Sequence, residues 1–328
     1  MSKIDDLCSW RYFLAFARTG NLTTAAQSLK VDVSAVSRAI AGLEKALGCE
    51  LIRHNSRPME LTENGKFVVK RMTPIVQAHD SLMQKLLDDN SALAGNIRLS
   101  SAPGFAARRL TPLLQRFQEM HPEITIEIMS GYKPADVQKG LCDVATITGE
   151  PTLPGLCYMS RGRNVYLPVA SPDYIAKHGM PLDPVSLRSH TGLIYTGPVR
   201  DETKELWRGK RCEPINFAAT IRSTDILAIR SALLEGMGVA VDMPLVQIYE
   251  DLLEGRLVAI LPGWFHPPIE CFIVASRDAW HMKRVRIFLE WYAKAMQELF
   301  AYYESQVSAV VGLPQDNIAI DRTKIYRT

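Results

Sequence analysis

Apolar positions between residues 22 and 47 follow two short helical periods with a break between them. The first period places one group of side chains on a common helical face: Leu22, Ala25, Ala26 and Leu29. The second period does the same for Val36, Ile40 and Leu43. Asp32 precedes the second period, and its carboxylate can cap the free backbone N–H groups of a helix start. The pattern predicts a helix-turn-helix whose second helix exposes Ser34, Ser37 and Arg38.

A predicted β-hairpin follows these two helices. Leu51-Ile52 and Met59-Glu60-Leu61 flank a basic turn that carries Arg53 and Arg57. Arginines in such a turn suit a phosphate backbone or a narrow minor groove of DNA, and the exposed groups of the second helix suit phosphates and guanine edges. The alternative is a small helical domain whose charges are only solvated. The hairpin directly after the two helices favours DNA binding.

This arrangement resembles the winged helix-turn-helix of LysR-type transcriptional regulators. The matching residues run through nearly the whole module: Phe13 or Phe16, Ala25-Ala26, Leu29, Ser34-Ala35-Val36-Ser37, Ile40, Leu43-Glu44, Gly48, Leu51, Arg53, Leu61-Thr62 and Gly65. Asn21 stands where the family usually has serine, and Val33 replaces a glutamine that usually contacts bases. The candidate DNA-contacting residues are Thr23, Thr24, Asp32, Val33, Ser34, Ser37, Arg38, Arg53 and Arg57.

A long helix is predicted after the hairpin. Its apolar seam alternates spacings of four and three, as in a coiled coil: Val68, Met72, Ile75, His79, Leu82 and Leu86. Pro74 lies inside the helix and should bend it. A lone seam would expose an apolar stripe, so we expect it to pair with a second copy of the chain; packing on its own domain is the alternative. Pairing would hold two recognition helices at the spacing of an inverted repeat.

From residue 96 onward, predicted strands alternate with helices. The strands Ile97–Ser100, Glu123–Ile128 and Cys142–Ile147, with an amphipathic helix from Leu110 to Met120, predict a parallel sheet covered by helices. The chain should enter a second subdomain near Val165–Val169, and this subdomain contains Gly192–Tyr195 and a helix from Asp225 to Leu234. It should return through Glu270–Val274. Two crossings between two α/β lobes predict a hinged clamshell with a cleft.

The same family resemblance extends over this region, as far as about residue 295. The matching pieces are Leu110-Thr111-Pro112-Leu113-Leu114 with Phe117, His121-Pro122, Gly140–Ala145, and Gly236–Val239 ending in Pro244. The expected fold class is α/β with an N-terminal all-α winged helix-turn-helix, a linker helix and a two-lobed, periplasmic-binding-protein-like effector domain. The expected limits are 1–65 for the DNA-binding domain, 66–95 for the linker and dimerisation helix, 96–300 for the effector-binding domain and 301–328 for a C-terminal extension. Within the effector-binding domain, lobe I should cover about 96–163 and 268–300, and lobe II about 164–267.

The turns at the strand ends should face the cleft and bind a small effector. The candidate residues are Ser101, Pro103, Gly104, Phe105, Tyr132, Thr146, Thr196, Arg200, Thr224, Asp225 and Ile269. In the family the first turn often offers a hydroxyl to an effector carboxylate, and Pro103, Gly104 and Phe105 occupy that place here. Helix N-termini and Arg200 favour a small anion, and Phe105 and Tyr132 can stack on an aromatic part.

Composition adds the expected environment. The hydrophobic content of 47% argues against general disorder, and a net charge of only +3 means that basic character must be local. Up to Arg71 there are 11 Lys and Arg against 7 Asp and Glu. The six cysteines have no paired spacing, which indicates free thiols in a reducing compartment. No signal peptide and no apolar run of membrane length are seen, so we expect a cytoplasmic protein without a membrane partner.

Other classes of protein have weaker support. No G-x-S-x-G elbow and no H-x₃-H or H-E-x-x-H spacing occurs, so neither an enzyme nor a metal site is expected, and no cofactor is implied. Gly236 and Gly238 lack the third glycine of a dinucleotide fingerprint. A redox sensor using Cys212 would lack a resolving cysteine nearby in sequence. A periplasmic-type solute binder shares the clamshell, but the N-terminal module argues against it.

The C-terminal end extends beyond the family pattern. The last helix is expected to continue to Gly312, and Ile318-Ala319-Ile320 with Lys324-Ile325-Tyr326 should form either an extended arm on a neighbouring subunit or a disordered tail. As a whole, the sequence predicts a LysR-like transcription factor that binds double-stranded DNA as a dimer of dimers. Its cleft should sense a small-molecule effector, and RNA polymerase is a further candidate partner.

Overall fold

The computed structural model describes residues 4–53, 59–88, 93–130, 134–314 and 320–327. Two compact units make up the chain: Met1–Ser91 with Lys139–Leu141, and Ala92–Gln138 with Cys142–Thr328. Arg57 and Tyr132 lie outside the described residues, as do Ile318 and Ala319. In the described parts, no helix combines the length and apolar character needed to cross a membrane.

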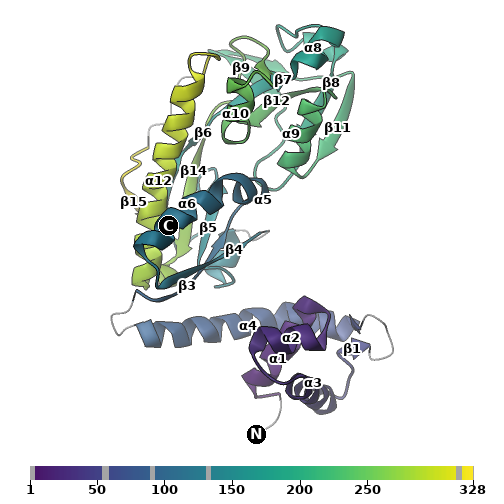
Figure 1. Ribbon diagram of the computed structural model, residues 1–328, viewed down its shortest axis with the longest axis vertical. Coiled ribbons are helices and arrows are strands. Elements are labelled where there is room, and N and C mark those ends of the chain that lie inside the picture. Colours follow the sequence, from purple (N-terminus) through teal and green to yellow (C-terminus); the bar gives the residue numbers. More distant parts are fainter. Residues whose placement is uncertain (1–3, 54–58, 89–92, 131–133, 315–319, 328) are drawn as a thin grey trace. The chain divides into compact units, whose positions relative to one another are not determined.

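The first unit contains the predicted helix-turn-helix and hairpin. Its elements are α1 (Leu7–Thr19), α2 (Leu22–Leu29), α3 (Val33–Leu47), β1 (Ile52–Arg53), β2 (Glu60–Leu61) and α4 (Glu63–Asp88) (Figure 1). Asn21 caps α2 through its side-chain oxygen, which accepts from the backbone N–H groups of Thr23 and Thr24 at 2.7 and 3.2 Å. Asp32 occupies the N-cap position of α3, but its side chain makes no capping bond. The predicted carboxylate cap is therefore wrong: the exposed Asp32 carboxylate faces water, and only its carbonyl accepts from α3, at Ala35.

The three helices and the hairpin share one core. Phe13, Ala25, Ala26, Val36 and Leu43 are all buried in it, as the apolar spacing predicts. The Glu44 carboxylate joins the helices to the hairpin, because one of its oxygens accepts from the backbone N–H groups of Leu51 and Ile52 at 2.7 and 3.0 Å. Buried carboxylate hydrogen bonds of this kind hold the hairpin at a fixed place beside α3.

Helix α4 continues through Pro74 and has two kinds of apolar positions. Val68 and Met72 are partly buried against the core of the first unit, together with the fully buried Val76. Ile75 and Leu82, further along the predicted seam, are each 52% exposed. The seam is thus divided: Val68 and Met72 pack on their own domain, as the alternative interpretation held, and half-buried His79 contacts Arg11 of α1, whereas Ile75 and Leu82 remain uncovered. The side chain of Leu86 is outside the described part of the helix.

The second unit contains two sheets. The larger has the order β15-β6-β14-β5-β3-β4. Its strands are β3 (Gly95–Ser100), β4 (Ile124–Met129), β5 (Val144–Thr148), β6 (Leu156–Asn164), β14 (Ile269–Ser276) and β15 (Ile325–Arg327). Only β3 pairs in parallel with its neighbours β4 and β5; the β14 pairings with β5 and β6 are antiparallel. The predicted parallel sheet is therefore mixed: β14 runs against β5 and β6, and β15 runs against β6, whereas β6 keeps the direction of β3, β4 and β5.

The smaller sheet has the order β11-β8-β12-β7-β13. Its strands are β7 (Tyr166–Ala170), β8 (Thr191–Tyr195), β11 (Ala219–Ser223), β12 (Val239–Pro244) and β13 (Val258–Ala259), and β9 (Glu205–Arg208) pairs with β10 (Arg211–Pro214) in a separate hairpin. The chain passes from the larger sheet to the smaller between β6 and β7, and returns between β13 and β14. Two crossings between two α/β lobes are confirmed.

Helices cover both sheets. Beside the larger sheet lie α5 (Pro103–Phe105), a π-helical turn η1 (Ala106–Leu110), α6 (Thr111–Met120), α7 (Pro134–Gln138), α11 (Arg277–His281) and α12 (Lys283–Val307). With the smaller sheet are α8 (Pro172–His178), a 3₁₀ turn η2 (Ser186–Ser189), α9 (Ile226–Leu234) and α10 (Leu245–Leu253). Figure 1 shows α12 running along β6 and β14, and buried side chains from both lobes join in one continuous core.

The C-terminal extension differs from what the sequence suggests. Helix α12 ends at Val307 and not at Gly312. Further on, β15 pairs antiparallel with β6 of the same chain, with Ile325 opposite Met159 and Arg327 opposite Cys157. The described part of the extension is therefore neither a disordered tail nor an arm on a neighbouring subunit; backbone pairing to its own sheet holds it in place.

Candidate DNA-binding surface and effector cavity

The outer face of α3 presents the groups that the sequence assigns to DNA. Ser34, Ser37 and Arg38 are exposed, and Val33 is 40% exposed beside them. The Arg38 guanidinium donates through Nε to the carbonyl of Ser34 at 3.1 Å, which holds the side chain along the helix surface. Thr23 and Thr24 are exposed in the first turn of α2. Short hydroxyls and one guanidinium on a helix with no bulky neighbours can enter a major groove.

The hairpin places one further arginine. Arg53 lies on β1 opposite Glu60 of β2, with the guanidinium 3.9 Å from the carboxylate and both side chains more than half exposed. Such an exposed pair is weak and leaves the arginine free to exchange its partner for a phosphate. Asp32 is exposed at the start of α3 but, as an anion, it can only orient neighbouring groups or accept from a base.

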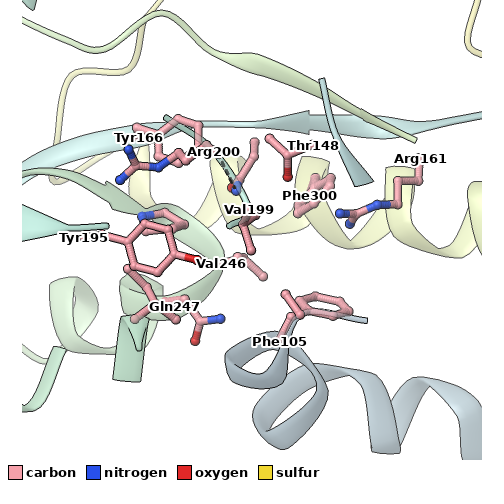
Figure 2. Close-up of a pocket in the computed structure, with 14 residues that line it drawn as sticks. Phe105, Thr148, Arg161, Tyr166, Tyr195, Val199, Arg200, Val246, Gln247 and Phe300 are labelled. Carbon is pink, nitrogen blue, oxygen red and sulfur yellow. Dashed lines mark hydrogen bonds between the residues drawn. The ribbon is translucent and has the colours of Figure 1, made fainter. Parts of the chain in front are cut away.

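A cavity lies between the two lobes of the second unit. Its volume is about 70 Å³. Fourteen residues line it: Ala102, Phe105, Thr148, Arg161, Asn164, Tyr166, Tyr195, Val199, Arg200, Ile226, Pro244, Val246, Gln247 and Phe300. Figure 2 shows side chains of both lobes converging on this space. The lining contains two arginines and no carboxylate.

Phe105 and Arg200 are the sequence-predicted candidates that line the cavity. Gly104 lies beside it, where a Cβ would be 2.5 Å from Ile226 Cγ2 and 3.6 Å from Gln247 Nε2. The absence of a side chain at Gly104 thus allows the two lobes to approach each other. Pro103 is in the same short helix, although its side chain is outside the described part.

The other predicted candidates do not line this cavity. Ser101 and Thr146 are joined by a 3.3 Å hydrogen bond between their hydroxyls, so they satisfy each other behind the wall. Thr196 donates its backbone N–H to Ser223, and Asp225 caps α9 by accepting from Leu227. Thr224 is exposed just before this cap, and Ile269 lines a separate surface hollow beside Tyr326. These positions follow the strand ends, as expected, but local hydrogen bonding or distance keeps them from the space between the lobes.

Arg200 is neutralised within the protein. Its guanidinium lies 2.7 Å from the carboxylate of Asp242, and both side chains are almost fully buried. A second N–H donates to the Asp242 carbonyl at 3.2 Å, and the guanidinium stacks on the rings of Tyr166 and Tyr195. An arginine already paired with a buried carboxylate has little charge left for a ligand, so the prediction that Arg200 supplies the anion site loses its physical basis.

Arg161, on β6, is the charged cavity residue that was absent from the sequence-based candidates. It is only 8% exposed, and Figure 2 shows its guanidinium pointing into the cavity. Its Nε donates to the carbonyl of Phe272 at 3.3 Å, and the guanidinium carbon lies 5.7 and 5.8 Å from the ring centroids of Phe105 and Phe300. No sequence signal singles out Arg161, because Ser160, Arg163 and Asn164 interrupt the same apolar stretch.

Two amides and two phenols complete the polar lining. Within the described residues, Gln247 Oε1 and Asn164 Oδ1 are buried without a hydrogen-bond partner. Asn164 donates its amide N–H to the Tyr166 hydroxyl at 3.3 Å. Burial raises the pKa of Tyr166 and of Tyr195, so both rings carry neutral hydroxyls at physiological pH. The cavity therefore offers one unpaired cation, two unfilled acceptors and aromatic walls.

A cluster of ion pairs joins the lobes next to this cavity. Arg108 and Arg109 of η1 both bind the carboxylate of Glu250 on α10, at 2.6 and 2.9 Å. They also donate to the carbonyls of Gln247 and Val246, at 3.1 and 3.0 Å. We call Arg108, Arg109 and Glu250 the interlobe clamp. Phe105 directly precedes η1, and Val246 and Gln247 line the cavity. A ligand that moves these three residues would therefore act directly on the interlobe clamp.

Comparison with known proteins gives the family. Residues 7–66 match the model for the bacterial regulatory helix-turn-helix protein of the lysR family, and residues 90–297 match the LysR substrate binding domain. The chain belongs to the LysR-type transcriptional regulators, DNA-binding proteins with an effector-binding domain and not enzymes.

Relatives and solved structures agree over nearly the whole chain. An uncharacterized HTH-type transcriptional regulator of Escherichia coli K12, YhjC, is 27% identical over 301 residues, covering 90% of this chain and 99% of that protein. The structure of a full-length variant of AphB is similar with a TM-score of 0.67 at 25% identity, covering 88% of this chain and 98% of that one. The LysR-type regulator CrgA from Neisseria meningitidis is similar with a TM-score of 0.56 at 26% identity, covering 88% and 98%.

Proposed function

We propose that this regulator binds an inverted-repeat promoter site as a dimer of dimers and responds to a small anionic metabolite in the interlobe cavity. The observation that carries the effector part is the composition of the cavity wall: Arg161 without a carboxylate partner among the described residues, no carboxylate in the lining, and a majority of apolar or aromatic side chains. A site with net positive charge and low polarity binds small organic anions in preference to cations or neutral polar solutes.

DNA binding is assigned to the exposed face of α3 and to the hairpin. Ser34, Ser37 and Arg38 read the major groove, Thr23 and Thr24 contact phosphates, and Arg53 with Arg57 reaches the flanking backbone. Val33 touches a thymine methyl group or packs against the sugar-phosphate chain. The uncovered half of α4 supplies the dimer contact that sets the spacing of two such surfaces.

Effector binding changes the relative stability of lobe arrangements and, through them, the geometry of the oligomer on DNA. A ligand shifts such an equilibrium only as far as it binds one arrangement better than the other. The cavity meets this condition, since its wall is formed by both lobes and adjoins the interlobe clamp.

Footprinting on the DNA upstream of the protein's own gene, across a salt series, tests the DNA-binding proposal. We expect protection of an inverted repeat over several helical turns that weakens steeply with salt. Arg38→Ala and Arg57→Ala should each weaken binding by about tenfold or more, as loss of a base or phosphate contact costs about 1–3 kcal/mol. The matched control is Arg71→Ala on α4, which keeps native affinity. Full-strength binding by both hairpin and α3 variants, with native folding, would remove this assignment.

A further inference from the structure

Arg161 lies in the cavity wall and has no carboxylate partner among the described residues, whereas three other largely buried arginines of the second unit each pair with one. Arg98 pairs with Asp143, Arg163 with Glu304 and Arg200 with Asp242, each at 2.6–2.7 Å. Arg284, which is 3% exposed, donates instead to the carbonyl of Asn96 at 3.1 Å. Among the described residues, the only polar contact of Arg161 is the single bond from Nε to the Phe272 carbonyl. The other nitrogens of its guanidinium face the cavity.

Such a charge is costly to bury. Placing a guanidinium in a low-dielectric space without a counter-ion is unfavourable, and an anionic ligand would supply the missing counter-ion. The flanking rings of Phe105 and Phe300 stabilise the cation in part, because each presents its π-system at under 6 Å. A guanidinium can donate to both oxygens of a carboxylate, which makes a carboxylate a suitable counter-ion.

A second feature concerns hydrogen-bond acceptors. Gln247 is only 3% exposed, and its Oε1 has no hydrogen-bond partner among the described residues. Asn164 Oδ1, in the same cavity wall, is also buried without such a partner. An unfilled buried acceptor is satisfied by a ligand hydroxyl. Around both amides the surface is apolar, formed by Tyr166, Tyr195, Ile226, Val246 and Phe300.

We propose that Arg161, and not Arg200, is the anion-binding residue of the effector cavity, and that the effector is a small hydroxycarboxylic acid with an apolar body. The inference rests on the proposed function of the cavity as the effector site. The carboxylate binds the guanidinium of Arg161, the hydroxyl donates to Gln247 or Asn164, and the apolar body packs on the aromatic walls. The volume of about 70 Å³ restricts the ligand to a short chain or a single ring with a slight opening of the lobes.

The test uses the full-length protein and three hydroxy acids, lactate, mandelate and 4-hydroxybenzoate, each beside its neutral amide. Isothermal titration and thermal unfolding measure binding. At least one acid should bind and raise the melting temperature, with its amide at least tenfold weaker, because the amide cannot pair with Arg161. No binding by any acid at millimolar concentration overturns the ligand class, and so does phosphate binding as tightly as the best acid. If the native protein binds an acid and its amide with equal affinity, the carboxylate charge does not contribute to binding, and the proposed pairing with Arg161 is wrong.

Variants then assign the residue. Arg161→Met should weaken binding of the best acid at least tenfold, whereas Arg161→Lys keeps the charge and retains a measurable part of the affinity. Gln247→Leu should weaken 4-hydroxybenzoate more than benzoate, which lacks the donor. The control is Arg211→Met, whose side chain is 70% exposed, pairs with Glu213 on its own hairpin and does not line the cavity. Native affinity of a folded Arg161→Met protein would overturn the assignment.

The DNA footprint separates this proposal from the broader one. Each variant in the cavity should protect the same DNA as the native protein in the absence of acid. Retained DNA binding with no acid binding refutes the ligand proposal alone. Loss of acid binding in Arg161→Met with intact DNA binding supports it.

Discussion

Gly65 links the hairpin to α4 through a contact that excludes any side chain. A Cβ at this position would lie 2.2 Å from the carbonyl oxygen of Leu51 and 3.4 Å from the Cβ of Leu61. The close neighbour is backbone, which cannot rotate away, so Gly65→Ala must displace the hairpin. We expect a loss of about 1–3 kcal/mol in the unfolding free energy of the first unit, measured by urea denaturation.

A matched control exists for this substitution. Gly312→Ala adds the same methyl group at a position with nothing within 4 Å, and it should leave the unfolding free energy unchanged. If Gly65→Ala unfolds at the same urea concentration as the native chain, the hairpin is not held by this close approach.

Single residues show what the sequence can and cannot reveal. Position alone does not decide a helix cap: Asn21 bonds to the residues two and three further on, whereas Asp32, at the same place before α3, makes no such bond. Whether an arginine is neutralised depends on a partner far along the chain: Asp242 for Arg200, and none among the described residues for Arg161. The sequence contains no record of that difference, so it pointed to the paired arginine and passed over the unpaired one.

At the scale of elements, the interlobe clamp between η1 and α10 makes stability depend on pH. The hydrogen bond from Arg109 is the largest cause that lowers the pKa of Glu250, from 4.5 to about 2. The folded state therefore keeps this carboxylate ionised where the unfolded chain already protonates it. The resulting stabilisation is complete above about pH 4.5 and is lost as the pH falls toward 2.

Glu250→Gln should remove this contribution. Because the side chain is about one-third exposed and screened by water, we expect a loss of only about 1–2 kcal/mol at pH 7 and a smaller loss at pH 3. Urea denaturation of the native and variant proteins at both pH values measures the difference. Glu119→Gln, on the exposed end of α6, is the control. A difference that is equal at pH 7 and pH 3 would contradict the role of the ionised carboxylate.

The C-terminal strand provides the second prediction for an element. Arg322, just before β15, pairs with Glu270 at 2.9 Å, and this glutamate is only 7% exposed. Glu270 also accepts from the hydroxyl of Ser160 on β6. Arg322→Ala leaves a buried carboxylate without its cation and should destabilise the second unit by about 2–4 kcal/mol. Lys324→Ala, in the same extension, should have little effect; equal thermal stability of both variants would show that the pair contributes nothing.

Periodicity predicted the elements well where their partners are near in sequence. The helices of the first unit, β3 to β5, and α9 follow from apolar spacing and turn residues. The direction of β14 and the pairing of β15 with β6 depend instead on strands more than 100 residues apart, so no local pattern encodes them. The C-terminal segment was expected on another subunit for the same reason. Its apolar residues need a packing partner, and the sequence does not show whether that partner belongs to the same chain or to a second copy.

For the whole molecule, the exposed part of α4 is the surface that a second copy should cover. Ile75 and Leu82 stand two helical turns apart and are each 52% exposed, whereas Val68 and Met72 are already packed on their own unit. The dimer contact should therefore be limited to the later part of the helix. In a full coiled coil, by contrast, the contact would extend along the whole seam.

Ile75→Glu and Leu82→Glu place a charge in this contact without touching the core of either unit. Their dimer dissociation constants, measured by sedimentation over a range of concentrations, should rise at least tenfold, since a buried unpaired carboxylate costs more than about 1.4 kcal/mol. Lys70→Glu, an exposed position on the other side of α4, tests whether charge alone is responsible and should associate like the native chain. A monomeric native protein would contradict the dimer itself. Variants that associate normally would show that the dimer contact lies outside this part of α4. Since two recognition surfaces bind an inverted repeat together only when they are joined, the same variants should protect single half-sites weakly and lose the extended footprint.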